Sequence, residues 1–105
     1  MAETVEETDL KITHEGIIFV KSTTSTKGLA TCIFGSAINE QKKEIRLRGI
    51  GAGSICQMTK AFIITKGRLS EKGVNATVDM YFKDIQSRRE GEDSITAVEY
   101  LVKFN

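Results

Sequence analysis

Apolar residues recur along the chain with two different periods, and the order of these periods predicts the order of the secondary-structure elements. Residues 17–20 form a continuous apolar run, which is typical of a strand buried on both faces. Two segments carry apolar residues at helical spacing, 29–41 and 54–67. Three segments alternate apolar and polar residues, as half-buried strands do: 44–50, 75–85 and 95–104. The predicted order is therefore strand, helix, strand, helix, strand, strand.

This order predicts an α/β two-layer sandwich. Right-handed crossovers place both helices on one face of a mixed four-stranded sheet. The last two strands are expected to form an antiparallel hairpin whose turn is the polar stretch 86–94. Gly67 is expected to end the second helix. The domain is predicted to span 16–105 and to follow an acidic, flexible segment, 1–15.

Charge divides the chain unevenly. The net charge is +1, but residues 1–15 contain one lysine and five acidic residues, whereas residues 16–105 contain 14 basic and nine acidic residues. A mildly basic body permits binding to nucleic acid without requiring it. The acidic start is unlike a signal peptide, and no apolar run approaches the ~20 residues of a membrane span, so we expect a cytoplasmic or nuclear protein.

Residues that carry chemistry are few. The chain has two cysteines and one histidine, too few for a zinc site, and no nucleophile with a nearby base can be identified. We therefore expect no metal, no cofactor and no enzymatic activity. Cys32 and Cys56 lie in apolar, helix-like stretches, so both are predicted to be free thiols packed in the core.

Three glycines separate the second strand from the second helix: Gly49, Gly51 and Gly53. One interpretation is a phosphate-binding helix start, because the first backbone amides of a helix and the helix dipole both favour an anion. The other is that the glycines only form a tight turn or allow two segments to approach closely. The sequence leaves both interpretations open.

The stretch "IGAGSICQMTKAFIITKG" (50–67), with the later Asp84–Ile85, Gly91–Glu92 and Thr96–Ala97 pairs, resembles the stage V sporulation protein S family within the Alba superfamily. The resemblance implies a β-α-β-α-β-β fold and a non-catalytic dimer that binds DNA or RNA without sequence preference. It implies contacts from the connector after the first strand, the glycine loop and the final hairpin. The corresponding residues are Lys21, Lys27, Arg48, Gly51, Gly53, Lys83, Arg88 and Arg89.

The second helix is apolar on nearly all sides, which suggests a homodimer interface. The interface residues are predicted to be Ile55, Met58, Phe62 and Ile63. A groove between the two helices would bury some of the same surface. The near-neutral charge, the apolar helix and the acidic segment also fit a second function, a protein assembly or scaffold module with little affinity for nucleic acid.

The polar face of the sheet is expected to carry both charges. Arg46 and Arg48 share that face with Tyr81, so a base could stack there. Asp79 and Glu99 lie on it as well, which favours cross-strand ion pairs instead.

Overall fold

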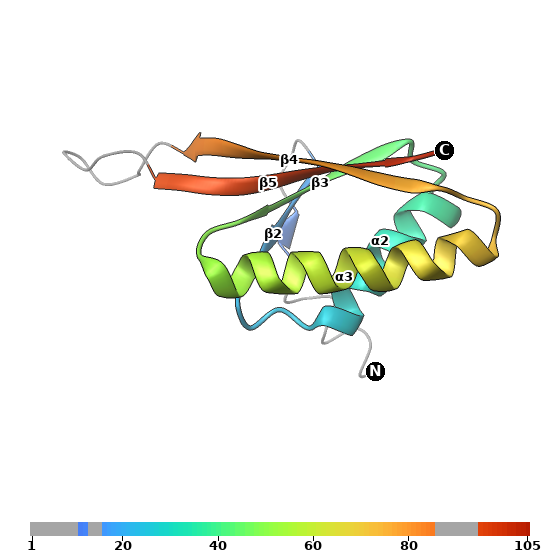
Figure 1. The fold of residues 1–105 in the computed structure, drawn as a ribbon, viewed down its shortest axis with the longest axis horizontal. Coiled ribbons are helices and arrows are strands. Elements are labelled where there is room, and N and C mark those ends of the chain that lie inside the picture. The colour runs from blue at the N-terminus through green and yellow to red at the C-terminus, as the bar shows by residue number, and fades with distance from the viewer. Residues whose placement is uncertain (1–10, 13–15, 86–94) are drawn as a thin grey trace.

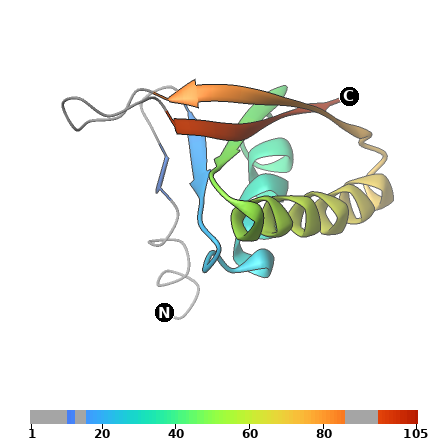
Figure 2. The ribbon, with the colours of Figure 1, turned by 60° about the vertical axis from the view of Figure 1, so that its left-hand side comes forward.

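Two helices cover one face of a mixed sheet, as the sequence predicted, and both ribbon views show them on the same side (Figures 1 and 2). The computed structural model describes residues 11–12, 16–85 and 95–105. The helices are α2 (Thr26–Ile38) and α3 (Ala52–Glu71). The strands are β1 (Lys11–Ile12), β2 (Ile17–Val20), β3 (Glu44–Gly49), β4 (Ala76–Ile85) and β5 (Ile95–Phe104).

The sheet has the order β1-β2-β3-β5-β4. β2 and β3 run parallel, joined by the crossover through α2, and β3 and β5 run antiparallel. β4 and β5 pair over ten residues each, from Ala76 opposite Phe104 to Ile85 opposite Ile95. The predicted four-stranded mixed sheet is therefore confirmed, and the two-residue β1 adds a fifth strand along β2. The predicted turn 86–94 lies outside the described residues.

The second helix is longer than predicted. Gly67 lies inside α3 and does not end it. The helix continues to Glu71, Lys72 caps it, and Gly73 follows with a φ of 76°, a conformation that glycine adopts without strain. An internal glycine costs a helix only about 1 kcal/mol relative to alanine, and the burial of Leu69 two residues beyond it outweighs this cost.

The core lies between the helices and the sheet. Its largest wholly buried side chains come from both layers: Leu29, Ile33, Leu47, Met58, Leu69 and Val102. The buried stripe of α3 runs through Ser54, Met58, Ala61, Thr65 and Leu69. Met58 is 0% exposed and packs in the core, so its side chain offers no surface to a second subunit. This corrects the assignment of Met58 to a dimer interface. Ala61 faces inward on this stripe, and Phe62 beside it is only half-buried.

We expect Met58→Ala to lower the free energy of unfolding by about 2–5 kcal/mol, because the truncated side chain leaves a cavity under the sheet. Lys60→Ala, an exposed change on the same helix, should shift it by less than about 0.5 kcal/mol. Urea unfolding followed by circular dichroism measures both. If both variants changed the free energy of unfolding by equally small amounts, Met58 would not be a core residue.

Candidate nucleic-acid interface

Three segments lie at the same end of the molecule (Figure 1): the connector between β2 and α2, the start of α3, and the end of the hairpin where β4 finishes and β5 begins. The topology requires this arrangement for the first two, because parallel β2 and β3 both end there. The three segments predicted to contact nucleic acid therefore share one end of the domain. Arg88 and Arg89, predicted contacts in the hairpin turn, lie outside the described residues.

The connector is held in place by hydrogen bonds that start and end on Thr24, a buried residue. The Thr24 amide donates to the Lys21 carbonyl at 3.0 Å, and the Lys21 amide donates to Thr24 Oγ1 at 2.8 Å. Gln57 Nε2 of α3 donates to the Thr24 carbonyl at 2.7 Å. Ser25 Oγ then caps α2 by accepting the Gly28 amide at 3.0 Å, as the polar sequence of the connector allows. The connector is thus a fixed turn attached to the first turns of α3.

Two of the three glycines allow close approach. A Cβ on Gly53 would lie 2.6 Å from Ser22 Cβ, so the connector packs directly on the first turn of α3. A Cβ on Gly49 would lie 2.7 Å from Met58 Sδ and 2.8 Å from Ser54 Cβ, so α3 packs against the end of β3. These distances support the close-approach interpretation for Gly49 and Gly53.

Gly51 has a different role. Its φ is 88°, and nothing lies within 4 Å of the position a Cβ would take. It is the N-cap of α3 and provides no side-chain acceptor for the first amides of the helix. The nearby Ser54 hydroxyl donates backward to the Ile50 carbonyl at 3.0 Å. The first-turn amides of α3 therefore begin on an exposed surface, Gly51 to Gly53, where an anion can approach them.

The predicted cations do not all lie together. Lys21 is exposed on the connector, beside Ser22 and the start of α3. Lys27, in the first turn of α2, lines a shallow hollow of about 390 Å³ between the two helices, whose other lining residues are Thr26, Lys60, Ile63 and Ile64. Lys83 is exposed on the sheet face away from the helices. Of the predicted lysines in the described residues, Lys21 is the one that adjoins the glycine loop, through its neighbour Ser22, which contacts Gly53.

Arg48 is held by a buried carboxylate. It lies directly opposite Glu99 across β3 and β5, and its guanidinium contacts Glu99 Oε1 at 2.7 Å through Nη2 and 2.8 Å through Nε. The Arg48 side chain is 13% exposed and the Glu99 side chain 3% exposed. The Phe19 ring stacks beside the guanidinium, with its centroid 5.4 Å from Arg48 Cζ. Arg48 is thus engaged within the sheet, as the cross-strand interpretation predicted.

Tyr81 completes this cluster by donating its hydroxyl to Glu99 Oε2. Burial alone raises the pKa of Glu99, but the hydrogen bonds from Tyr81 and Arg48 and the charges of Arg48 and Arg46 lower that pKa below its usual value. Burial and the hydrogen bond to the Glu99 carboxylate raise the pKa of Tyr81. Glu99 therefore remains ionised at neutral pH and neutralises one arginine of the face.

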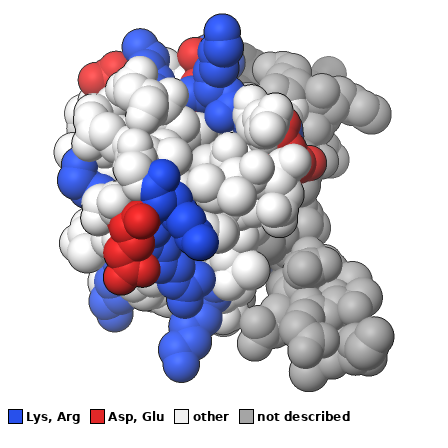
Figure 3. Space-filling model, turned by 90° about the vertical axis from the view of Figure 1, so that its right-hand side faces the viewer, with Lys and Arg blue, Asp and Glu red and all other residues white. Residues whose placement is uncertain are grey.

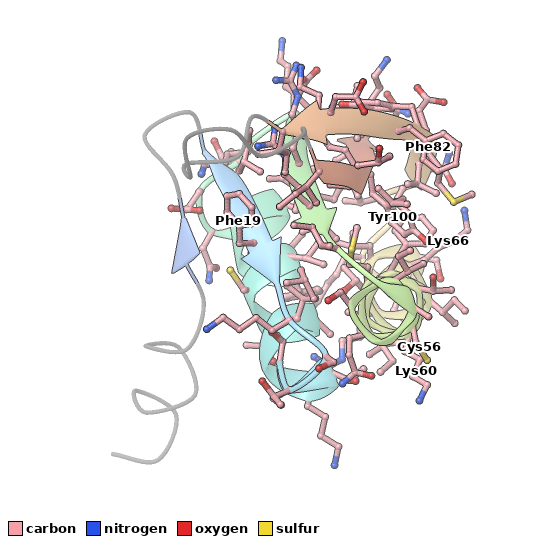
Figure 4. All side chains as sticks on the ribbon, turned by 90° about the vertical axis from the view of Figure 1, so that its left-hand side faces the viewer. Phe19, Cys56, Lys60, Lys66, Phe82 and Tyr100 are labelled. Carbon is pink, nitrogen blue, oxygen red and sulfur yellow. The ribbon has the colours of Figure 1, made fainter. Side chains whose placement is uncertain are left out.

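Several apolar side chains of α3 and β4 remain exposed. Ile63 on α3 is 63% exposed, and Met80 and Phe82 on β4 are 63% and 78% exposed. Ile55 and Phe62, two predicted interface residues, are half-buried against the core. Figure 4 shows Phe82 and Cys56 on the opposite side from Phe19. Cys56 is an exposed free thiol, which corrects the expectation that it is in the core, and Cys32 is half-buried.

The opposite end of the molecule, where α3 finishes, has mixed charge. In Figure 3 its basic side chains are scattered over the surface, and acidic side chains lie directly beside some of them. Among the described residues no group of three or more His, Cys, Asp or Glu side chains could hold a metal ion. Nor does any helix in those residues have the length and apolar character needed to cross a membrane.

Sequence reasoning missed the contacts that two residues make in this site, those of Ser22 and Gln57. Gln57 gave no signal, because its contact is with a carbonyl 33 residues away. Ser22 was one of several polar connector residues, and only the position of Gly53 in space reveals its packing.

Comparison with known proteins agrees with this architecture. The family described as Stage V sporulation protein S (SpoVS) matches residues 16–105. The chain belongs to this SpoVS family. No curated protein matches it in sequence. A similar solved structure is Alba from Thermoplasma volcanium, with a TM-score of 0.56 and 17% identity over 83% of this chain and 98% of that chain. The SpoVS chain therefore has an Alba-like fold, as its sequence predicted.

We expect Gly53→Ala to lower the free energy of unfolding by about 1–3 kcal/mol, because its methyl group would push Ser22 and the connector away from α3. Ser22→Gly removes the colliding atom, so the double variant Ser22→Gly/Gly53→Ala should recover part of the loss. Gly67→Ala, in open space within the same helix, should instead stabilise the fold by about 0.5–1 kcal/mol. Chemical unfolding of the wild-type protein, the two single variants Gly53→Ala and Gly67→Ala, and the double variant measures these changes. If Gly53→Ala changed the free energy of unfolding as Gly67→Ala does, the close packing of Gly53 on Ser22 would be refuted.

Glu99→Gln should lower the free energy of unfolding at pH 7 by about 2 kcal/mol, since it removes the negative partner of a buried arginine. The lowered pKa of Glu99 means that its stabilisation is present above the unfolded-state pKa, roughly 4.3, and disappears as pH falls through the folded-state pKa. The wild-type protein should therefore lose more stability than the variant between pH 7 and pH 3. Unfolding curves at both pH values measure the difference, and equal losses would contradict the assignment.

Proposed function

We propose that this protein is a non-enzymatic module that binds DNA or RNA, without sequence preference, as a homodimer. The observation that carries the proposal is the contact between Ser22 and Gly53, together with the uncapped start of α3. This contact makes the connector and the glycine loop one continuous, exposed surface. The surface offers backbone amides, the Ser22 and Thr23 hydroxyls and the Lys21 ammonium, which are all groups that bind phosphate.

Two of the remaining predicted contacts lie away from this surface: Lys27 is in the first turn of α2, and Lys83 is exposed on the sheet face away from the helices. Arg88 and Arg89, in the predicted hairpin turn, remain proposed contacts from the sequence alone. Arg48 plays a different part: its pairing with Glu99 fixes β3 against β5 behind the glycine loop. The Alba-like fold adds support, since Alba proteins are the superfamily that the sequence resembles. A dimer would present two such surfaces, and the affinities of two linked sites reinforce each other.

A second function, protein assembly, is favoured by one observation: the exposed apolar residues Ile63, Met80 and Phe82. Large exposed apolar side chains on a small domain favour an interaction surface. If the protein is a nucleic-acid-binding module, these apolar residues form the contact between the two subunits of its dimer. In a scaffold they would hold a different protein, and the glycine loop would serve only to pack α3.

Fluorescence anisotropy with labelled duplex DNA and single-stranded RNA, at low and physiological salt, tests the proposal. We expect micromolar or tighter binding that weakens steeply with salt. Lys21→Glu should weaken binding at least tenfold at low salt and reduce the salt slope by at least about 1, because it removes one phosphate contact. Lys43→Glu, the same charge change at the other end of β3, should have little effect.

Absence of binding to either nucleic acid at low salt would overturn the nucleic-acid function and leave the assembly module. Binding that Lys21→Glu and Lys43→Glu weaken equally would show a diffuse charge effect and would contradict the site at the connector.

A further inference from the structure

β4 forms an open edge of the sheet. It pairs with β5 on one side through all ten residues without a bulge, and no strand lies on its other side among the described residues. Such an edge presents a row of backbone donors and acceptors to any extended chain. At one end, Lys66 Nζ of α3 donates to the Ala76 carbonyl at 2.7 Å. The common protections of an edge, proline and bulges, are absent from β4.

The edge is also apolar where it is most exposed. Met80 and Phe82 lie on the helix-facing side of β4, and Tyr81 between them lies on the other side. Met80 is opposite Tyr100, whose hydroxyl contacts Thr59 Oγ1 of α3 at 2.8 Å. The surface therefore reaches from the strand to Thr59 on α3, whereas Ile63, one turn beyond Thr59, lines the hollow between the two helices. Figure 4 shows Phe82 and Tyr100 above α3 on this side.

We propose that the β4 edge pairs antiparallel with β4 of a second copy, in the register that places Tyr81 opposite Tyr81. This inference rests on the dimer of the proposed function and specifies where its two subunits meet. The two sheets would join into one, with both helix layers on the same side, because residues of the same parity lie opposite each other. The two-fold axis would pass through the Tyr81 pair.

Charge complementarity selects this register and a second copy of this chain. In an antiparallel two-fold pair centred on Tyr81, Asp79 lies opposite Lys83 of the other copy, and Met80 lies opposite Phe82 of the other copy, each twice. Opposite charges and apolar pairs at directly opposed positions stabilise a sheet. A shift of two residues along the strand in either direction places Asp79 and Lys83 opposite uncharged residues. Within the described residues Asp79 forms a single, exposed ion pair, with Lys103 at 4.0 Å, and Lys83 has no ion-pair partner and lies opposite Ala97.

In this dimer Lys83 binds the second copy and leaves the set of phosphate contacts. The connector and the start of α3, by contrast, stay exposed. The pairing thus separates the subunit interface, along β4, from the proposed phosphate surface at the end of the sheet.

Charge exchange tests the register. Sedimentation velocity over a wide range of protein concentrations would compare the wild-type protein with Asp79→Lys, Lys83→Asp and the double variant Asp79→Lys/Lys83→Asp. Each single change places like charges opposite each other twice, so we expect the dimer dissociation constant to rise at least tenfold. The double variant restores opposite charges and should return to within about threefold of wild type. Asp84→Lys, an equal charge change on the same strand at a position opposite Val78, should change the dissociation constant by less than about threefold.

Circular dichroism at low protein concentration checks that every variant folds. A wild-type dimer that ignores the single changes, or a double variant no better than the singles, would overturn the β4 pairing while leaving the proposed dimer intact. A wild-type protein that stays monomeric at all concentrations would overturn both the pairing and the dimer. Nucleic-acid binding is measured separately by anisotropy, so its failure is distinguishable from either result.

Discussion

The close approach of α3 to the end of β3 and to the connector is the constraint on which the rest of the structure depends. Gly49 and Gly53 leave space that Met58 and Ser22 occupy, at separations where an added Cβ would collide. Because α3 can therefore lie directly on the end of β3, Met58 and Leu69 reach the core along its buried stripe. The same approach brings the connector onto the first turn of the helix. Core packing and the shape of the candidate phosphate surface follow from one contact geometry.

Ion pairing reduces the number of side chains that are free to bind a phosphate. A count of basic residues suggests a broadly positive sheet face, but Glu99 holds Arg48 within the sheet and receives the Tyr81 hydroxyl. An arginine engaged with a buried carboxylate must break that pair before it can bind a phosphate, and breaking a buried pair is unfavourable by several kcal/mol. Affinity for nucleic acid in this protein would thus depend on exposed lysines and backbone amides, a weaker set than a continuous arginine surface.

The order of elements could be predicted from the sequence because periodicity is a local property. The strand Ile17–Val20 and the strand Ile95–Phe104 have the predicted boundaries, and both helices lie on one face. The prediction that α3 ends at Gly67 was wrong because helix propensity is a smaller effect than the burial of Leu69 two residues later. Nor could the sequence predict that Met58 lies in the core, because a helix that is apolar on nearly all sides does not reveal which side faces the core.

The candidate site was predictable only in part, for a similar reason. Lysines and glycines can be found in a sequence, but their distances from one another depend on contacts between distant segments. Gln57 bonds a connector 33 residues away, and Arg48 meets Glu99 51 residues away. The sequence contained the right residue types for both a phosphate surface and an ion-pair cluster. The strand register decided which of the two Arg48 joined.

The proposed subunit edge and the proposed phosphate surface lie on different parts of this small domain. The apolar side chains of β4 lie along the side of the sheet, whereas the glycine loop and the connector lie at its end. A second copy on β4 would leave the end of the sheet uncovered, so subunit pairing and anion binding do not compete for the same residues apart from Lys83. The long, evenly paired hairpin is the feature that makes this possible. It keeps β4 at the open edge of the sheet, where Met80 and Phe82 are exposed for a partner while β5 holds the strand in place.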